Sequence, residues 1–203
     1  MRFCLGFELV FFPLYFGIGA LTAASGRARG FYFDWELAIP RVDWMVVPYL
    51  LVIPAFLLPI LHLDARRIDA LGRQAIVAVL VAAVVFVLLP GRIGYGPQPA
   101  EGLFAPLLGF VAMVDTPHNT LPSLHVVCAV LIYRACGEAA GRAVALGYWA
   151  WLGLTVASTV LVHQHHLADV ASAIALAAVI RRLLPIPKAV AVDDGVRPGA
   201  GGA

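Results

Sequence analysis

Residues 75–90 read AIVAVLVAAVVFVLLP, a stretch in which no side chain carries a charge. Comparable apolar stretches recur along the chain, so that hydrophobic residues make up 62% of its 203 residues and charged residues only 13%. Soluble domains are about half apolar and about a quarter charged, so one water-soluble core would not bury this excess. A transmembrane helix needs roughly 20 mostly apolar residues. The sequence therefore predicts an all-α fold, a polytopic membrane protein with six transmembrane helices.

Working outward from 75–90, the other expected spans are 3–24, 45–63, 121 onward, 143–162 and 165–182. The polar stretch 64–73, DARRIDALGR, is expected to be a turn between two spans. Residues 26–44 mix charges with aromatic side chains, a composition typical of a segment lying on the membrane surface. The apolar stretch 102–114 is too short and broken for a span, so we expect an interfacial or re-entrant helix in the outer loop.

Residues 1–184 are thus expected to form one membrane domain, and residues 185–203 a disordered cytoplasmic tail. Six spans place both termini on one side of the membrane. Of the 14 Lys and Arg residues, ten fall on that side and four on the other. By the positive-inside rule we expect cytoplasmic termini in a cell inner membrane, with the 91–121 connection facing the periplasm or exterior. The basic residues are spread thinly, which predicts no nucleic-acid partner.

Five of the six histidines fall at the outward-facing ends of the expected spans: His118, His125, His163, His165 and His166. Ionisable groups at membrane depth are costly, so this gathering indicates a functional site. In TLPSLH, residues 120–125, Thr120 is the expected N-cap of a helix. Ser123 and His125 would then lie beside unpaired backbone N–H groups, which favour an anion such as phosphate.

In STVLVHQHHLADV, residues 158–170, the side chains of His165 and Asp169 are four positions apart. On a helix this spacing places both on one face, where the carboxylate accepts a hydrogen bond from one ring nitrogen and leaves the other free. A nucleophilic histidine requires that arrangement. An Asp–His pair that only holds two helices together is the alternative explanation of the spacing.

The ordered pair of PSLH and S-x6-H-x3-D, here Ser158, His165 and Asp169, resembles the second and third motifs of the type 2 phosphatidic acid phosphatase and haloperoxidase superfamily. DTPHNTLPSLHV followed by VHQHHLADV is most similar to the inositol-phosphorylceramide-synthase-like membrane branch of that superfamily. The resemblance covers about residues 85–175 by motif and the whole chain by its six-span plan. It implies an enzyme that cleaves a phosphoester of a membrane lipid through a phosphohistidine, with no metal and no other cofactor.

The resemblance also implies a role for each matching position. His165 would be the nucleophile, Asp169 the carboxylate that orients it, and His125 the acid that protonates the departing alcohol. Arg92 matches the arginine of the first motif, and Ser123 with its backbone neighbours would bind phosphate oxygens. All five residues are present in this chain.

Two positions depart from the family pattern. Val85 stands where the family places a lysine, and Thr159 stands where it often places an arginine. Relatives in the synthase-like branch carry a basic residue nearer the nucleophile, a position that His163 occupies here. We therefore expect His163 to complete the phosphate site in place of the missing arginine.

Several alternatives stay open or are disfavoured by the sequence alone. Hydrolysis and transfer of a phosphate headgroup share the same intermediate, and no sequence feature separates them. A non-catalytic scaffold or transporter that retains the fold would explain the missing basic residues. Haem ligation by His125 and His165 would leave Arg92 and Ser123 unexplained. A zinc site from residues 163, 165 and 166 is disfavoured because only positions three or four apart share a helix face.

Overall fold

The structure, a computed structural model, describes residues 2–96 and 98–188, without the side chains of residues 2–8. Most of the expected cytoplasmic tail, residues 189–203, lies outside the described residues. Within the described ranges the chain is helical and contains two isolated β-bridges but no strand. The all-α prediction is therefore confirmed.

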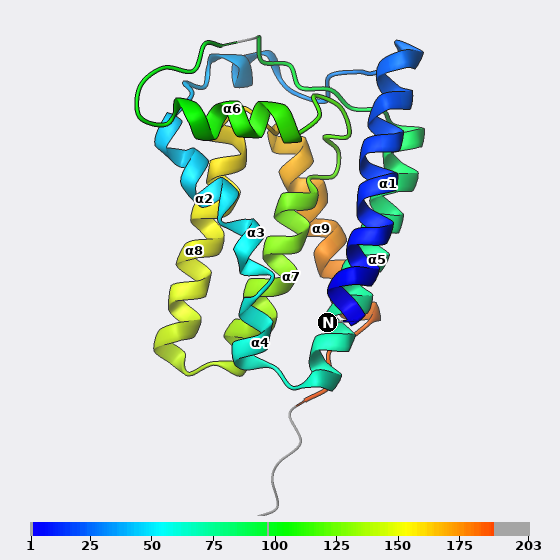
Figure 1. The fold of residues 1–203 in the computed structure, drawn as a ribbon, viewed down its shortest axis with the longest axis vertical. Helices are drawn as coiled ribbons and strands as arrows, with labels where there is room; N and C mark the ends of the chain where they lie inside the picture. Colours follow the sequence, from blue (N-terminus) through cyan, green and yellow to red (C-terminus); the bar gives the residue numbers. More distant parts are fainter. Residues whose placement is uncertain (1, 97, 189–203) are drawn as a thin grey trace, which may run out of the picture.

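The helices form an upright bundle, in which successive long segments alternate in direction (Figure 1). The elements are α1 (Arg2–Ser25), the short 3-10 helices η1 (Asp34–Ala38) and η2 (Asp43–Met45), α2 (Val46–Leu50), α3 (Val52–Ala55), α4 (Leu58–His62), α5 (Ala65–Leu88), α6 (Ala105–Val114), α7 (Leu124–Ala139), α8 (Arg142–Leu161) and α9 (Leu167–Leu183). Helix α7 packs against α3, α4, α5, α8 and α9, while α1 packs along α5. Val126, Val127 and Leu131 of α7 are almost fully buried, so the centre of the bundle is built around this helix.

The expected second span, residues 45–63, is divided into α2, α3 and α4. Pro48, Pro54 and Pro59 lie in these three helices in turn. Proline lacks the N–H that would continue the helical hydrogen-bond ladder, and its ring clashes with the preceding turn. The sequence places three prolines in this span, and the result is a chain of short helices rather than one rod.

The expected turn at residues 64–73 is wrong, because most of this stretch belongs to α5. The Asp64 carboxylate accepts a hydrogen bond from the backbone N–H of Arg67 at 3.0 Å and caps the first turn. An aspartate in this position satisfies one of the unpaired N–H groups at a helix start. The charged residues therefore extend the apolar helix by about three turns instead of interrupting it.

Within the described part of the chain, α5 and α8 are long and apolar enough to cross a membrane, by length and composition. Residues 9–25, 43–55 and 105–114 form shorter apolar helical stretches. Helical structure occurs at each of the six expected span positions, but the six-span membrane topology itself stays a prediction.

The two ends of the bundle differ in what they carry. Helix α6 and the connections 26–44, 89–96, 98–104 and 115–123 lie at one end, shown at the top of Figure 1, where α7 and α9 begin. At the opposite end α7 and α9 finish, and Glu138 pairs there with Arg134 at 3.1 Å and with Arg181 at 2.5 Å. The histidine-rich segments therefore meet at the α6 end.

Candidate active site

His165 lies in the connection between α8 and α9, and its Nδ1 is 3.5 Å from Oδ2 of Asp169. The same Oδ2 accepts the backbone N–H of His166 at 2.9 Å, which closes the first turn of α9. The structure thus brings His165 and Asp169 together, although His165 precedes the helix instead of sharing a helix face with Asp169. Asp169 is only 1% exposed, so its carboxylate is buried beside the imidazole.

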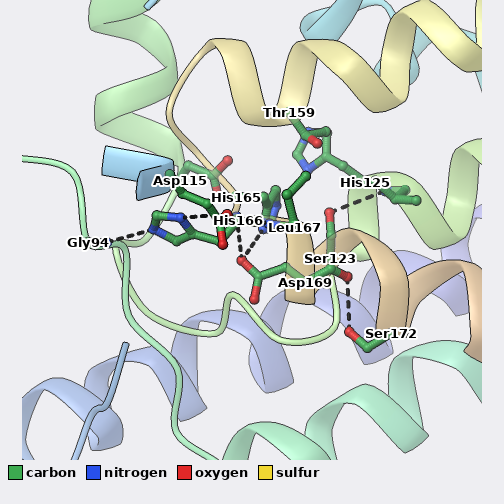
Figure 2. A network of polar contacts seen from close by, with 12 residues as sticks. Gly94, Asp115, Ser123, His125, Thr159, His165, His166, Leu167, Asp169 and Ser172 are labelled. Carbon is green, nitrogen blue, oxygen red and sulfur yellow. Dashed lines mark hydrogen bonds and ion pairs between the residues drawn. The ribbon is translucent and has the colours of Figure 1, made fainter. Parts of the chain in front are cut away.

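His125 stands in the first turn of α7 and faces His165, with 6.3 Å between the two ring centroids (Figure 2). The backbone N–H of Ser123 donates to the carbonyl oxygen of Asp169 at 3.2 Å. This bond ties the start of α7 directly to the start of α9. Two sequence motifs about forty residues apart are therefore fixed in one site by the main chain as well as by their side chains.

Ser123, and not Thr120, is the N-cap of α7. Its Oγ accepts the backbone N–H of Val126 at 3.3 Å, and the side chain is fully buried. The helix starts three residues later than expected because the capping hydroxyl comes from Ser123. The backbone N–H groups of Leu124 and His125 come before the capped N–H of Val126, and they lie at the positive end of the helix dipole.

Arg92 is exposed and pairs through its backbone with His118 in an isolated antiparallel bridge. Burial, and then the positive charge of Arg92, lower the pKa of His118. The backbone N–H of Arg92 also donates to the carbonyl of Arg29 at 2.9 Å. The structure therefore places Arg92 beside the first connection and next to His118, whose pKa it helps to lower.

His163 is buried, with its Nε2 at 2.9 Å from the carbonyl oxygen of Ile39 and its ring stacked on Tyr95 at a centroid distance of 3.8 Å. Burial lowers the pKa of His163. In this arrangement Nε2 donates to the carbonyl, so the neutral ring offers no second N–H donor. A contact from His163 to phosphate would thus need a proton on Nδ1.

A carboxylate that the sequence analysis missed lies beside His125. Asp115, just after α6, accepts hydrogen bonds from the hydroxyl groups of Tyr15 and Tyr49. Tyr49 stacks on the ring of His125, and its hydroxyl oxygen is 3.4 Å from Nδ1. The two tyrosines precede Asp115 by 100 and 66 residues, so no spacing rule could have linked them. The only local signal is an acidic residue shortly before the PSLH motif.

A second missed carboxylate, Glu36, binds the start of α9. It is fully buried, accepts the backbone N–H groups of Phe33 at 2.9 Å and Leu167 at 2.8 Å, and lies 3.4 Å from Nδ1 of His166. Nε2 of His166 accepts the N–H of Gly94 at 3.0 Å. Glu36 and His166 therefore join three connections, 26–44, 89–104 and 162–166, around the candidate nucleophile.

The arrangement has the elements of covalent phosphoryl chemistry: an imidazole backed by a carboxylate, a second imidazole facing it, and a helix N-terminus alongside. In the described ranges no group of three or more His, Cys, Asp or Glu side chains is placed to hold a metal ion. Comparisons with protein-family models, curated proteins and solved structures find no match to this chain. The family resemblance accordingly stays a prediction.

Proposed function

We propose that this protein is an integral membrane enzyme that cleaves a lipid phosphoester through a phosphohistidine on His165. The observation that carries the proposal is the pair of facing imidazoles, 6.3 Å apart, with Asp169 behind one of them. Reacting atoms approach to about 3–3.5 Å before reaction, and two rings whose centroids are 6.3 Å apart are close enough for both to reach one phosphate ester, one at phosphorus and the other at the leaving oxygen. The proposal assigns His165 as nucleophile, Asp169 as its orienting carboxylate and His125 as general acid.

The reaction would proceed in two steps. Nε2 of His165 attacks phosphorus, the P–O bond to the lipid alcohol breaks, and His125 gives its proton to the departing oxygen. His125, now neutral, then takes a proton from water or from a lipid hydroxyl, whose oxygen attacks phosphorus and breaks the P–N bond. Water gives a phosphatase and a lipid hydroxyl gives a phosphotransferase.

Phosphate oxygens would be held by the N-terminal N–H groups of α7, together with Arg92, Ser123 and His163. Binding by the N-terminal N–H groups of α7 is supported by the position of His125, which lies in the first turn of that helix. The Ser123 hydroxyl already accepts from Val126 and retains its own proton to donate. Arg92 is exposed, whereas the ring of His163 is held by the carbonyl oxygen of Ile39.

The outer surface of the bundle supports a membrane location. Large apolar side chains on α5 and α9 are strongly exposed, including Val84 at 58%, Leu88 at 69% and Leu183 at 72%. Only 28% of the most apolar part of α8 is buried inside the protein. Exposed apolar surface on this scale is typical of a surface that contacts lipid. The Arg134, Glu138 and Arg181 cluster lies at the end opposite the histidines, which favours a site facing the periplasm or exterior.

The activity is tested by incubating the purified full-length protein with labelled phosphatidic acid, an isoprenyl diphosphate and phosphatidylinositol. We expect released phosphate or a new phospholipid, unchanged by chelators, and an acid-labile phosphoenzyme that His165→Ala abolishes. The product distinguishes hydrolysis from transfer. A strict magnesium or zinc requirement, or a phosphoenzyme that survives His165→Ala, would contradict the mechanism. No turnover of any of the three lipids would favour the scaffold or transporter alternative.

The topology is tested by cysteine labelling in whole cells. Ala100 lies in the connection at the histidine end, and Gly141 lies in the α7–α8 connection at the opposite end; both are exposed. In a background without the three native cysteines, Ala100→Cys should react with an impermeant thiol reagent and Gly141→Cys should react only after lysis. The reverse pattern would place the site in the cytoplasm.

A further inference from the structure

The mechanism above leaves Asp115 without a role, although this carboxylate is held by two tyrosine hydroxyls from two different helices. Tyr15 comes from α1 and Tyr49 from α2, and each donates to one oxygen of Asp115. The side chain that Tyr49 contacts on its other side is the proposed general acid, His125.

The hydrogen-bond directions follow from counting protons. Tyr49 has one hydroxyl proton and gives it to Asp115, so its oxygen can only accept from the ring of His125. Nδ1 of His125 is the nitrogen at 3.4 Å from that oxygen, and the two can pair only in the tautomer that carries hydrogen on Nδ1. In the neutral ring Nε2 is then the unprotonated nitrogen, and it is the atom that gains and gives the exchangeable proton.

The stacked geometry explains why the contact between Tyr49 and His125 is long. The two rings lie 4.2 Å apart at an interplanar angle of 17°, which fixes the plane of the imidazole. The negative charge of Asp115 lies directly behind the phenol. Burial tends to raise the pKa of Asp115, but the nearby His125 and the hydrogen bonds from Tyr15 and Tyr49 outweigh it and lower that pKa. The carboxylate is therefore ionised at neutral pH.

We propose that Asp115, acting through Tyr49, is a positioning residue for His125. It fixes the tautomer with hydrogen on Nδ1 and stabilises the charged imidazolium, so that Nε2–H is ready to protonate the leaving oxygen. This inference rests on the proposed function. Each histidine would then have its own carboxylate: Asp169 acts directly on His165, and Asp115 acts on His125 through the phenol of Tyr49. The charged and titratable groups around His125 are Asp115, Tyr49 and His165, and Tyr15 donates to the other oxygen of Asp115.

The kinetic test compares a poor and a good leaving group, since a good one needs little protonation. With phosphatidic acid, which expels an aliphatic alcohol, Asp115→Asn and Tyr49→Phe should each lower kcat by about 10²-fold, the usual size of a general-acid effect. With para-nitrophenyl phosphate both variants should stay within about 3-fold of the wild type, because nitrophenolate leaves unaided. Tyr15→Phe is the matched control: it removes a bond to Asp115 without touching His125, and should change neither rate strongly.

A second measurement does not depend on turnover. Nitrogen-15 NMR of the full-length protein in detergent micelles reports which ring nitrogen of neutral His125 carries hydrogen. We expect the Nδ1–H form in the wild type and in Tyr15→Phe, and a shift to Nε2–H in Asp115→Asn and Tyr49→Phe. In the asparagine variant Tyr49 would accept from the amide and direct its own proton to Nδ1.

The outcomes separate the two proposals. If Asp115→Asn slows both substrates equally, or leaves the tautomer unchanged, Asp115 only holds the helices together and the inference is overturned while the proposed function stands. If the wild type forms no phosphoenzyme with either substrate, the proposed function fails, and the tautomer result then decides only whether the Asp115–Tyr49–His125 chain exists. A wild type with hydrogen on Nε2 would overturn the inference by itself.

Discussion

The two facing histidines obtain their carboxylates in different ways. His165 is paired with Asp169, four residues later, at the start of the helix that follows it. His125 is connected to Asp115 through Tyr49, whose position is 66 residues before the carboxylate. The first pair is local and depends on one helix start. The second depends on α1, α2 and the connection after α6 all being packed in place, so it is the arrangement more sensitive to tertiary structure.

Of the substitutions that compare the two carboxylates, Asp169→Asn is expected to have the largest effect on the rate of phosphoenzyme formation. Asparagine still accepts the N–H of His166, so the first turn of α9 keeps its cap, but the charge behind His165 is lost. Phosphoenzyme formation should fall by about 10⁴-fold with both para-nitrophenyl phosphate and phosphatidic acid, as for other carboxylates that orient a catalytic histidine. Rapid-quench measurement of the phosphoenzyme tests this.

Asp115→Asn is the matched comparison, since it should affect only the substrate with the poor leaving group. If Asp169→Asn formed phosphoenzyme from the nitrophenyl substrate at the wild-type rate, Asp169 would not serve the nucleophile. The assignment of Asp169 to the nucleophile and of Asp115 to the general acid would then be wrong.

An intermediate effect is expected at Glu36, which we interpret as structural. Glu36→Ala leaves the N–H groups of Phe33 and Leu167 without an acceptor, and Glu36→Gln leaves one oxygen for the two. An orphaned buried donor costs about 1–3 kcal/mol, so the thermal midpoint in detergent should fall most for alanine and less for glutamine. Activity per folded molecule should change far less than with Asp169→Asn. A large loss of kcat in a folded Glu36→Gln protein would instead place Glu36 in the chemistry.

The smallest effect concerns His163 and the pH dependence of KM. Burial lowers the pKa of His163 below its usual 6.5, so the ring is neutral at pH 7 and becomes charged only as the pH falls through the lowered value. If His163 binds phosphate, KM should improve in mild acid and worsen as the pH rises through that range. His163→Gln, which keeps a donor for the Ile39 carbonyl, should remove this dependence. An unchanged KM profile in that variant would leave phosphate binding to Arg92 and the start of α7.

The sequence predicted the helical class and the approximate positions of the long segments because apolar length is a local property of the chain. The sequence-based prediction failed where a short stretch of residues was compatible with more than one local structure. The stretch 64–73 looked like a turn because of its charges, yet Asp64 caps a helix there. The three prolines at 48, 54 and 59 signalled the broken second segment, but a count of apolar residues alone ignored them.

By itself the sequence determined the candidates His125, His165 and Asp169, since each belongs to a short motif whose spacing carries chemical meaning. Only the tertiary structure decided that Asp115, Tyr15, Tyr49 and Glu36 surround them. Tyr15, Tyr49 and Glu36 are distant from the histidines along the chain, and Asp115, although it precedes His125 by only ten residues, is connected to it through Tyr49; hydrogen bonds over such separations leave no periodic signal in the sequence. Tyr49 of α2 stacks on His125 and donates to Asp115 after α6, Tyr15 of α1 donates to the same carboxylate, and the first connection carries Glu36 to the start of α9.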